Sequence, residues 1–327
     1  MKRIALAVIV AMGAAGAGLV AQSGNPFHGR SDTGETIRIL PPPAAIRSPH
    51  DTGPTFAPVR NQATTYPASY GSGNLVKHSG PVMAAKYGFY ALYWNNSASG
   101  ARQTSLGYAT LRDQMDAFLQ AFSNQGDANY SSADTGADYS IVQQYGSSKS
   151  FSFGPSWGTL VFSEATKSSI TDSALRTWLS NKLKSGTPGL TFSTDNIYGI
   201  YLPPGMKVTS GGASCSAFCG YHGQINVNGV VVKYAVFPYL NCAACSLSGL
   251  SVADMMTIVT SHEIREAATD PQLNAWYDAA GYEADDKCAW HNLYQMSTGG
   301  FWIQPEFSNG GTVGGITYPG PGCVVPR

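Results

Sequence analysis

The stretch Leu250–Pro271, LSVADMMTIVTSHEIREAATDP, specifies the start and the end of one helix. Ser251 is followed three residues later by Asp254, which is a capping-box arrangement: each side chain accepts a hydrogen bond from the other residue's backbone N–H. At the far end, the residue before Pro271 disfavours the α conformation. We therefore predict a helix over residues 252–269.

The faces of this helix predict a polar site in a buried position. At about 100° per residue, Met255, Val259, His262 and Glu266 fall on one narrow stripe, and its apolar members mark it as buried. An unpaired carboxylate there would cost several kcal/mol, so something must satisfy it. A divalent cation bound by His262 and Glu266, one turn apart, would do so. Alternatively, the two side chains hydrogen-bond to each other or to loop backbone.

The same residues form the pattern HExxE, one residue away from the HExxH signature of zinc hydrolases. Glutamate is an accepted zinc ligand. Glu263 lies about 80° from Met255 around the helix, where a general base would reach a metal-bound water. The spacing thus predicts Zn²⁺ as a cofactor, His262 and Glu266 as metal ligands and Glu263 as the catalytic base.

A further ligand is expected from YEADDKC, residues 282–288. Glu283 and Asp286 are three residues apart and could share a face in a turn, and Asp285 lies between them. If Cys288 is in a disulfide, these carboxylates are held in place. We predict Glu283 or Asp286 as the additional metal ligand, and the alternative is a solvated acidic loop.

Other polar and aromatic residues are weaker candidates. Asp270 is either a ligand or the cap of the turn at Pro271. His222, in CGYHG, lies among glycines that suggest a tight turn approaching something closely, and we favour an ordinary loop histidine there. His291 is expected to stack or hydrogen-bond in the last loops. Trp276 and Tyr277 would line a cleft, or pack beneath the helix.

Composition indicates an exported protein. The chain has 327 residues, 43% apolar and 12% charged, with 37 glycines. The charged share is about half of the usual one. The formal net charge is zero, so nothing points to nucleic acid or an anionic membrane as a partner.

The N-terminus predicts export directly. Lys2 and Arg3 precede an apolar run over residues 4–20, and Ala21 ends an acceptable cleavage site, so we expect a signal peptide over residues 1–21. An uncleaved anchor is the alternative, and no stable membrane insertion is expected after cleavage. Residues 22–74, rich in Pro, Gly, Ser and Thr, predict a flexible leader or pro-segment. A single domain is expected over residues 75–327.

Six cysteines occupy the C-terminal part of the chain, and an even number in an oxidising compartment predicts three disulfides. The local pairing is preferred, Cys215–Cys219, Cys242–Cys245 and Cys288–Cys323. A zinc site built from the four thiolates of CSAFC and CAAC is the alternative.

Strand and helix patterns follow one another along the domain. Strands are predicted over residues 86–94, 196–205 and 230–240, and helices over residues 104–124 and 169–186. This mixture predicts an α+β or α/β fold, in which a mixed sheet packs with helices and disulfides brace the C-terminal loops.

Several motifs together resemble the phosphate-induced proteins, also called the EXORDIUM-like family. They are CSAFCGYHG from Cys215, SHEIREAATDPQLNAWYD from Ser261, and the E-x-x-D-x-C pattern that ends at Cys288. HSGPV at His78 resembles the family's opening strand region. The resemblance covers residues 76–323. Asp270 departs from the plant pattern, where Asn is usual.

The resemblance implies an extracellular or cell-wall-associated protein, in a family without a firmly assigned reaction. We expect a secreted, zincin-like hydrolase acting on peptide bonds, and the alternative is a non-catalytic module that binds a cell-wall polymer and holds a structural metal or a hydrogen-bonded polar seam. In either case we expect a monomer.

Overall fold

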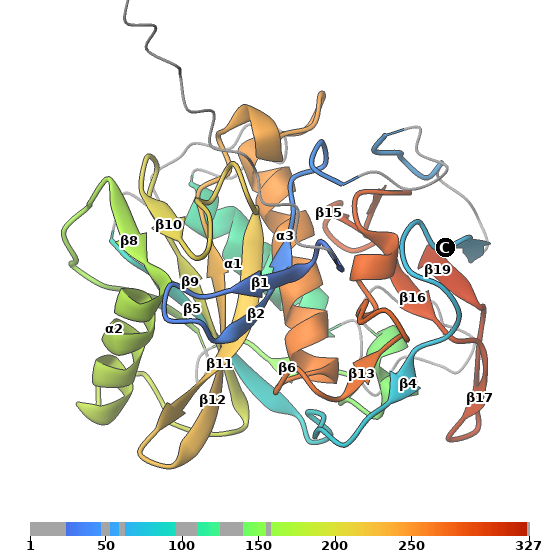
Figure 1. Ribbon diagram of the computed structural model, residues 1–327, viewed down its shortest axis with the longest axis horizontal. Coiled ribbons are helices and arrows are strands. Elements are labelled where there is room, and N and C mark those ends of the chain that lie inside the picture. Colours follow the sequence, from blue (N-terminus) through green and yellow to red (C-terminus); the bar gives the residue numbers. More distant parts are fainter. Residues whose placement is uncertain are drawn as a thin grey trace, which may run out of the picture.

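The computed structural model describes residues 24–46, 53–58, 63–95, 110–124, 140–154 and 158–325. Its centre is an eight-stranded mixed sheet in the order β1-β2-β11-β12-β9-β5-β6, with β7 paired to β5 outside this path (Figure 1). Strands β12, β9, β5, β6 and β7 pair in parallel, and β1, β2 and β11 pair antiparallel. The bounds of these strands are β1 His28–Arg30, β2 Thr36–Leu40, β5 Tyr87–Tyr93, β6 Phe151–Ser152, β7 Thr159–Val161, β9 Asn196–Tyr201, β11 Gly220–Val227 and β12 Val230–Phe237.

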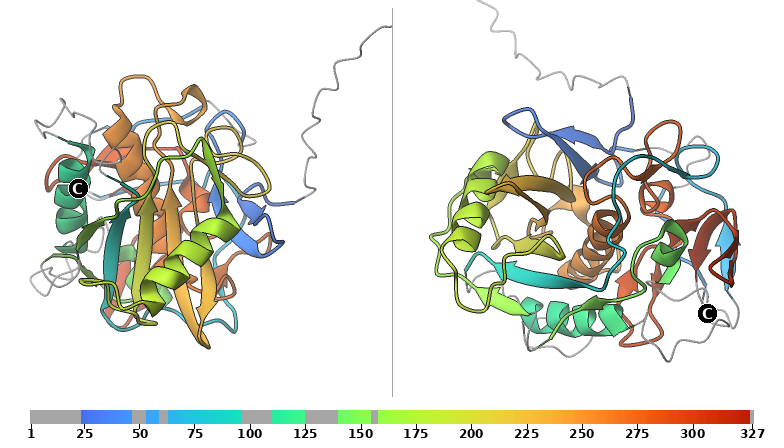
Figure 2. Two further views of the ribbon diagram at one scale, coloured as in Figure 1. Left: turned by 90° about the vertical axis from the view of Figure 1, so that its left-hand side faces the viewer. Right: turned by 90° about the horizontal axis from the view of Figure 1, so that it is seen from below.

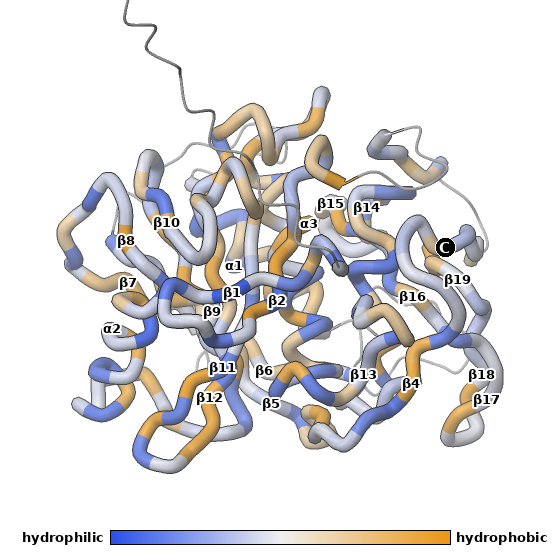
Figure 3. The backbone as a smooth tube through the Cα atoms, viewed as in Figure 1, coloured by the Kyte–Doolittle hydropathy of each residue, from blue (hydrophilic) through white to orange (hydrophobic). Residues whose placement is uncertain are grey.

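Helices cover both faces of this sheet. Helices α1 (Leu111–Asn124) and α3 (Val252–Thr269) lie on one face, and α2 (Asp172–Lys184) lies on the other (Figure 2). Successive residues of a strand point to opposite faces. Phe89 of β5 accordingly packs into the core with α1 and α3, whereas its neighbour Tyr90 packs into the core with α2. Hydrophobic stretches follow the central strands and α3 (Figure 3).

The chain after α3 forms short strands and loops beside the helix. Strand β15 contacts α3, β16 and β3 flank β19, and β4 pairs with β13. These elements are β3 Thr64–Tyr66, β4 Val76–Lys77, β13 Trp276–Tyr277, β14 Tyr294–Gln295, β15 Trp302–Ile303, β16 Glu306–Ser308, β17 Gly311–Val313, β18 Ile316–Tyr318 and β19 Gly322–Val325. The remaining elements are β8 Ser169–Thr171, β10 Lys207–Thr209, and the 3₁₀ helices η3 Ser140–Tyr145, η4 Ala243–Cys245 and η5 Asp286–Cys288.

The architecture confirms the predicted mixed sheet packed with helices. The predicted strands over residues 86–94, 196–205 and 230–240 correspond to β5, β9 and β12. Among the described residues, no helix is long and apolar enough to cross a membrane. The predicted signal peptide, residues 1–21, lies outside the described part of the chain.

Residues 22–74 differ from the predicted flexible leader wherever the structure describes them. Strand β2 joins the edge of the main sheet, and Ile37 and Leu40 are almost fully buried. His28 Nε2 lies 3.0 Å from the carbonyl oxygen of Gly281, and Trp290 Nε1 donates to the carbonyl of Pro41 at 2.9 Å. Strand β2 has only five residues, which is too short for an alternating pattern to stand out, and the prolines that follow it gave the stretch the composition of a flexible leader.

The disulfides confirm three bridges and correct two of the predicted pairings. Cys215 bonds to Cys242 and Cys219 bonds to Cys245, with Cα atoms 5.9 and 5.7 Å apart, while Cys288–Cys323 forms as predicted. The segment with Cys215 and Cys219 lies beside the segment with Cys242 and Cys245. Each disulfide joins one segment to the other instead of closing a loop within one of them. No described cysteine is free, which excludes the four-thiolate zinc site in this structure.

Candidate metal centre

Helix α3 has the predicted bounds and the predicted cap. The Ser251 side chain accepts from the Asp254 backbone N–H at 3.2 Å, and Asp254 Oδ2 accepts from the Ser251 N–H at 2.8 Å. Every residue of α3 from Ala253 to Thr269 is buried. The sheet covers one side of the helix and the C-terminal strands cover another, so its polar residues are enclosed all round.

His262, Glu266 and Asp286 converge as predicted. His262 Nε2 lies 3.1 Å from Glu266 Oε2 and 3.8 Å from Asp286 Oδ1. These three atoms are buried and make no hydrogen bond of acceptable geometry with the described residues. Ligand atoms of the three side chains lie within 4.8 Å of one another, so the group could hold a metal ion.

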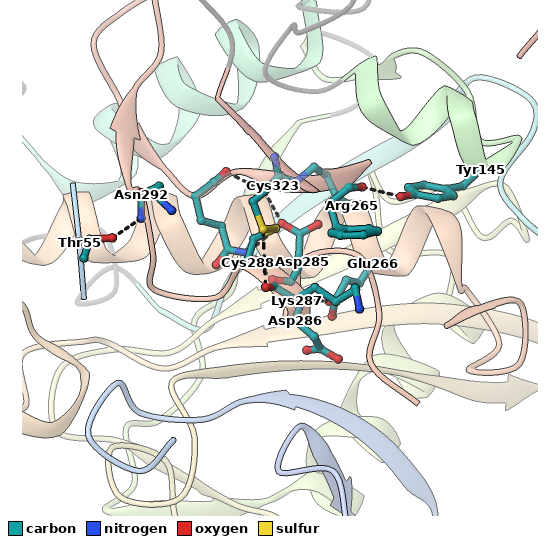
Figure 4. The surroundings of a disulfide bond; sticks show 12 residues. Thr55, Tyr145, Arg265, Glu266, Asp285, Asp286, Lys287, Cys288, Asn292 and Cys323 are labelled. Atoms are coloured by element: carbon teal, nitrogen blue, oxygen red, sulfur yellow. Dashed lines mark hydrogen bonds and ion pairs between the residues drawn. A yellow bond between two sulfur atoms is a disulfide. The ribbon is translucent and has the colours of Figure 1, made fainter. Parts of the chain in front are cut away.

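The second oxygen of each carboxylate is used to orient the first. Glu266 Oε1 accepts a hydrogen bond from the Asp286 backbone N–H at 2.9 Å. Asp286 Oδ2 accepts from the Glu283 backbone N–H, also at 2.9 Å. Figure 4 shows Asp286 beside Glu266, next to the Cys288–Cys323 disulfide. The loop backbone therefore fixes both carboxyl groups and leaves Glu266 Oε2 and Asp286 Oδ1 for a ligand.

The neighbouring acids of the loop have other partners. Glu283 Oε2 lies 3.0 Å from Arg38 Nε, and Glu283 Oε1 is 4.0 Å from His222 Nε2. Asp285 forms an ion pair with Arg265, and its backbone carbonyl accepts from Gln304 Nε2 at 2.8 Å. Of the two ligands that the sequence left open, the structure thus places Asp286 with His262 and places Glu283 with Arg38.

A second group, which the sequence did not predict, shares Glu266 with the first. His222, on β11, has its Nδ1 2.9 Å from Glu263 Oε2 and 3.8 Å from Glu266 Oε2. Ligand atoms of His222, Glu263 and Glu266 also lie within 4.8 Å of one another, so this buried group could hold a metal as well. We expected His222 to be an ordinary loop residue. It lies in a strand, and its position against α3 depends on non-local pairing.

Gly220 lets β11 approach α3 closely enough to form this group. A Cβ atom at Gly220 would lie 2.4 Å from Val259 Cγ1 and 3.2 Å from Glu263 Oε1. Real Cβ atoms do not approach side chains at the first distance, so a larger residue would force the strand and the helix apart. The glycines around His222 mark a close approach of β11 to α3, as predicted. They lie in a strand, however, rather than in the tight turn that we expected.

We expect Gly220→Ala to lower the free energy of unfolding by about 1–3 kcal/mol, the usual cost of overpacking a dense interior. Gly24→Ala is the matched control, because no atom lies within 4 Å of a Cβ built there. Denaturant unfolding of both variants measures the difference. Equal stability of the two variants would contradict the close packing of β11 on α3.

Acidic groups greatly outnumber bases around α3. Arg38 and Arg265 are the buried arginines that contact them. The buried carboxyl groups around them include those of Glu263, Glu266, Asp270, Glu283, Asp285, Asp286 and Glu306. Burial raises the pKa of Glu266 to about 8 and that of Asp285 to about 7. Burial, followed by repulsion from neighbouring carboxylates, raises the pKa values of Glu263 and Glu283 well above their usual range.

The two histidines have the opposite shift. Burial lowers the pKa of His262 and lowers that of His222 further, so both imidazoles are neutral near pH 7 and keep a lone pair for a metal. Ligand atoms bound at 2.0–2.2 Å around a tetrahedral zinc are about 3.3–3.6 Å apart. The 3.1 and 3.8 Å separations from His262 Nε2 fit this geometry after small side-chain movements.

The other candidates from the sequence have structural contacts. Asp270 Oδ1 accepts from the backbone N–H groups of Asn274 and Ala275, so the residue caps its turn. Tyr277 stacks on His78 with ring centroids 3.7 Å apart, and Trp276 packs against Tyr145. His291 Nε2 lies 3.3 Å from the hydroxyl of Tyr70, as expected of a residue that hydrogen-bonds in the last loops.

Two surface pockets lie elsewhere. One of about 1050 Å³ is lined by residues that include Arg30, Glu35 and Arg176, and one of about 300 Å³ is lined by residues that include Lys233 and Pro271. None of the side chains of the two groups that could hold a metal lines either pocket. The side chains of the polar cluster are almost fully buried, so the cluster is an enclosed site.

Comparison with known proteins adds no further assignment. No family model, curated protein or solved structure matches this chain. The resemblance to the phosphate-induced proteins therefore stays a prediction from motifs, and the assignment of the site depends on its geometry.

Loss of the Cys288–Cys323 disulfide should affect the metal site as well as the stability of the fold. Removing it with Cys288→Ala and Cys323→Ala should cost about 3–4 kcal/mol of stability and also weaken zinc binding, because Asp286 lies two residues from Cys288. Removing Cys215–Cys242 should cost a similar stability and leave zinc affinity unchanged. Calorimetry with zinc measures both. Equal zinc affinities in the two double variants would contradict a ligand role for Asp286.

Proposed function

We propose that this protein is a secreted zinc-dependent hydrolase that cleaves peptide bonds. The observation that carries the proposal is the convergence of His262 Nε2, Glu266 Oε2 and Asp286 Oδ1, three buried ligand atoms without hydrogen bonds among the described residues. Burial favours the protonated form of the carboxyl groups in this cluster, and a divalent cation would take the place of those protons. Zinc accepts both imidazole nitrogen and carboxylate oxygen in a tetrahedral arrangement, and we propose it as the metal for this set of ligands.

The metal would supply two effects when bound: it lowers the pKa of a coordinated water to about 7, and it polarises a carbonyl oxygen. Peptide hydrolysis adds one water across the C–N bond. The hydroxyl group goes to the carbonyl carbon, and the remaining proton goes to the leaving nitrogen. A residue beside the metal must carry that proton.

Glu263 is the residue that would carry the proton. It follows His262 on α3, and its Oε2 lies 2.9 Å from His222 Nδ1. This contact positions the carboxyl group, and the other oxygen, Oε1, has no hydrogen bond among the described residues. Burial and then the neighbouring Glu266 raise the pKa of Glu263, and a bound cation would lower it again and free the carboxylate to accept a proton.

Export is part of the proposal. Three disulfides persist in oxidising compartments and are rare in the cytosol. Together with the predicted signal peptide, they favour an extracellular location. The resemblance to the phosphate-induced proteins, which implies the same location, supports this part of the proposal.

A non-catalytic module with a structural metal is the second candidate, and burial favours it. His262, Glu263 and Glu266 are all fully buried, and structural zinc sites are closed whereas catalytic sites keep an open position. In that case the ion would stabilise α3 against the loop of Asp286. Exposed binding of a cell-wall polymer would then be independent of the ion.

Metal analysis combined with a peptide-cleavage assay separates the two candidates. We expect purified protein to contain zinc, to lose peptide hydrolysis when a chelator removes it under mildly destabilising conditions, and to regain hydrolysis when zinc is restored. A structural centre predicts loss of thermal stability on chelation, with no hydrolysis of any peptide before or after. Protein that binds no divalent metal would refute both.

A further inference from the structure

We propose that the β1–β2 segment occupies the place of a polypeptide substrate, and that an extended peptide bearing an arginine or lysine takes over its contacts with β11 and Glu283. The proposal rests on the proposed hydrolytic function for the fate of the peptide, but not for its binding. The segment would then keep the metal centre closed until it is displaced.

The first support is the way β2 joins the sheet. Residues 38–40 of β2 pair antiparallel with residues 220–222 of β11, and Arg38 lies opposite His222. His222 belongs to one of the two metal-binding groups. An extended peptide that adds to a sheet edge gains affinity from backbone hydrogen bonds and specificity from alternate side chains. The occupant of this edge is thus brought directly beside the centre.

The second support is the acidic pocket that receives Arg38. Its Nε lies 3.0 Å from Glu283 Oε2, and only 6% of the Arg38 side chain is exposed. Asp270, Asp286 and Glu266 also attract the guanidinium, so the pocket around Arg38 is acidic. Emptying the pocket would leave buried carboxylates unpaired, which is strongly unfavourable. A replacement peptide must therefore bring its own cation.

The third support is that the segment lies at the outer edge of the sheet (Figures 1 and 2). Strand β1 pairs with β2, and β2 pairs with β11 over three residues, so the segment can leave without separating two other described strands. Phe27 and Leu40 are buried beside the ladder. The cavities that they would leave are apolar, so the preferred peptide has hydrophobic residues on both sides of its basic residue.

Peptide exchange into the full chain tests this inference. The probe is a fluorescein-labelled peptide of residues 34–42, GETIRILPP. We expect it to bind the Arg38→Gln chain at least tenfold more tightly than the native chain, because the variant's own β2 is held less firmly. The same peptide carrying Arg38→Gln should bind the variant chain at least tenfold more weakly than the native peptide does. Fluorescence anisotropy measures both.

Arg30→Gln is the matched control chain. Arg30 is an exposed arginine on β1 whose guanidinium bonds to the Gly34 carbonyl at 3.1 Å, so this variant should behave like the native chain. If Arg38→Gln does not fold, a second protein is used in which a protease site replaces residues 47–52. The protease cuts this chain at that site, the two fragments stay associated, and the probe is added to their complex. Failure of the native peptide to enter either protein, or equal binding of both peptides, overturns the inference.

A parallel assay of peptide hydrolysis keeps this inference separate from the proposed function. Peptide exchange without hydrolysis of any peptide would refute the hydrolase and leave the binding edge in place. Hydrolysis at equal rates by the native and Arg38→Gln chains, without peptide exchange, would refute the covering role of β2 and leave the hydrolase.

Discussion

Glu263→Gln is expected to lower kcat for peptide hydrolysis by about 10²- to 10⁴-fold while zinc stays bound, because the amide cannot accept the proton of the attacking water. The substitution preserves shape, and the amide can still make the 2.9 Å contact with His222 Nδ1. The fold and the ligands His262 and Asp286 should therefore be unaffected. Steady-state kinetics and metal analysis on the same preparation measure the two effects.

Glu164→Gln is the matched control for this loss. Glu164 is a partly buried glutamate that pairs with Lys182 at 2.8 Å on the α2 side of the sheet, away from the centre. It should retain the activity and zinc content of the native chain. A Glu263→Gln protein as active as the control would remove the general base from the mechanism, although the metal site could stand.

If zinc binds as we propose, Glu266→Gln is expected to abolish most of the stabilisation that added zinc gives. A ligand at 1,000 times its dissociation constant stabilises the native state by about 4 kcal/mol. Glu266 Oε2 is central to this binding because it lies in both metal-binding groups, 3.1 Å from His262 Nε2 and 3.8 Å from His222 Nδ1. Replacing a charged ligand oxygen by a neutral amide weakens coordination of a divalent cation.

The metal-free Glu266→Gln protein should be about as stable as the metal-free native protein. Burial raises the pKa of Glu266 to about 8, so its carboxyl group is largely protonated at pH 7 without a metal, and an amide resembles it. The amide oxygen can still accept from the Asp286 backbone N–H. Thermal unfolding with and without zinc measures both quantities. An unchanged zinc-induced shift in Tm would exclude Glu266 as a ligand.

Local sequence signals were sufficient for helix α3. Ser251 and Asp254 formed the expected capping box, and the helix ended before Pro271 at Thr269. The i and i+4 spacing also brought His262 and Glu266 together, since that relation depends only on helix geometry. Glu283 and Asp286 lie three residues apart in one loop. This short spacing was enough to predict that one of the two side chains reaches α3.

Contacts between distant segments could not be predicted in this way. His222 reaches the centre because β11 packs on α3, and Arg38 reaches it because β2 adds to β11. Neither relation leaves a pattern in a window of ten or fifteen residues. The disulfides show the same limit, since spacing favoured Cys215–Cys219 whereas the packing of two turns against each other decided the observed pairs.

A metal ion can enter the centre easily only while the residues near position 38 are not packed against those near position 283. These parts are about 250 positions apart in the chain, and closing such long-range contacts is a slow step of folding. Before they meet, the polar side chains of α3 are open to water and to dissolved cations. After they have packed together, an ion can enter only when these two segments unfold locally. Zinc supplied during refolding should therefore enter promptly, whereas zinc offered to finished apoprotein should enter only at the rate at which the two distant segments part.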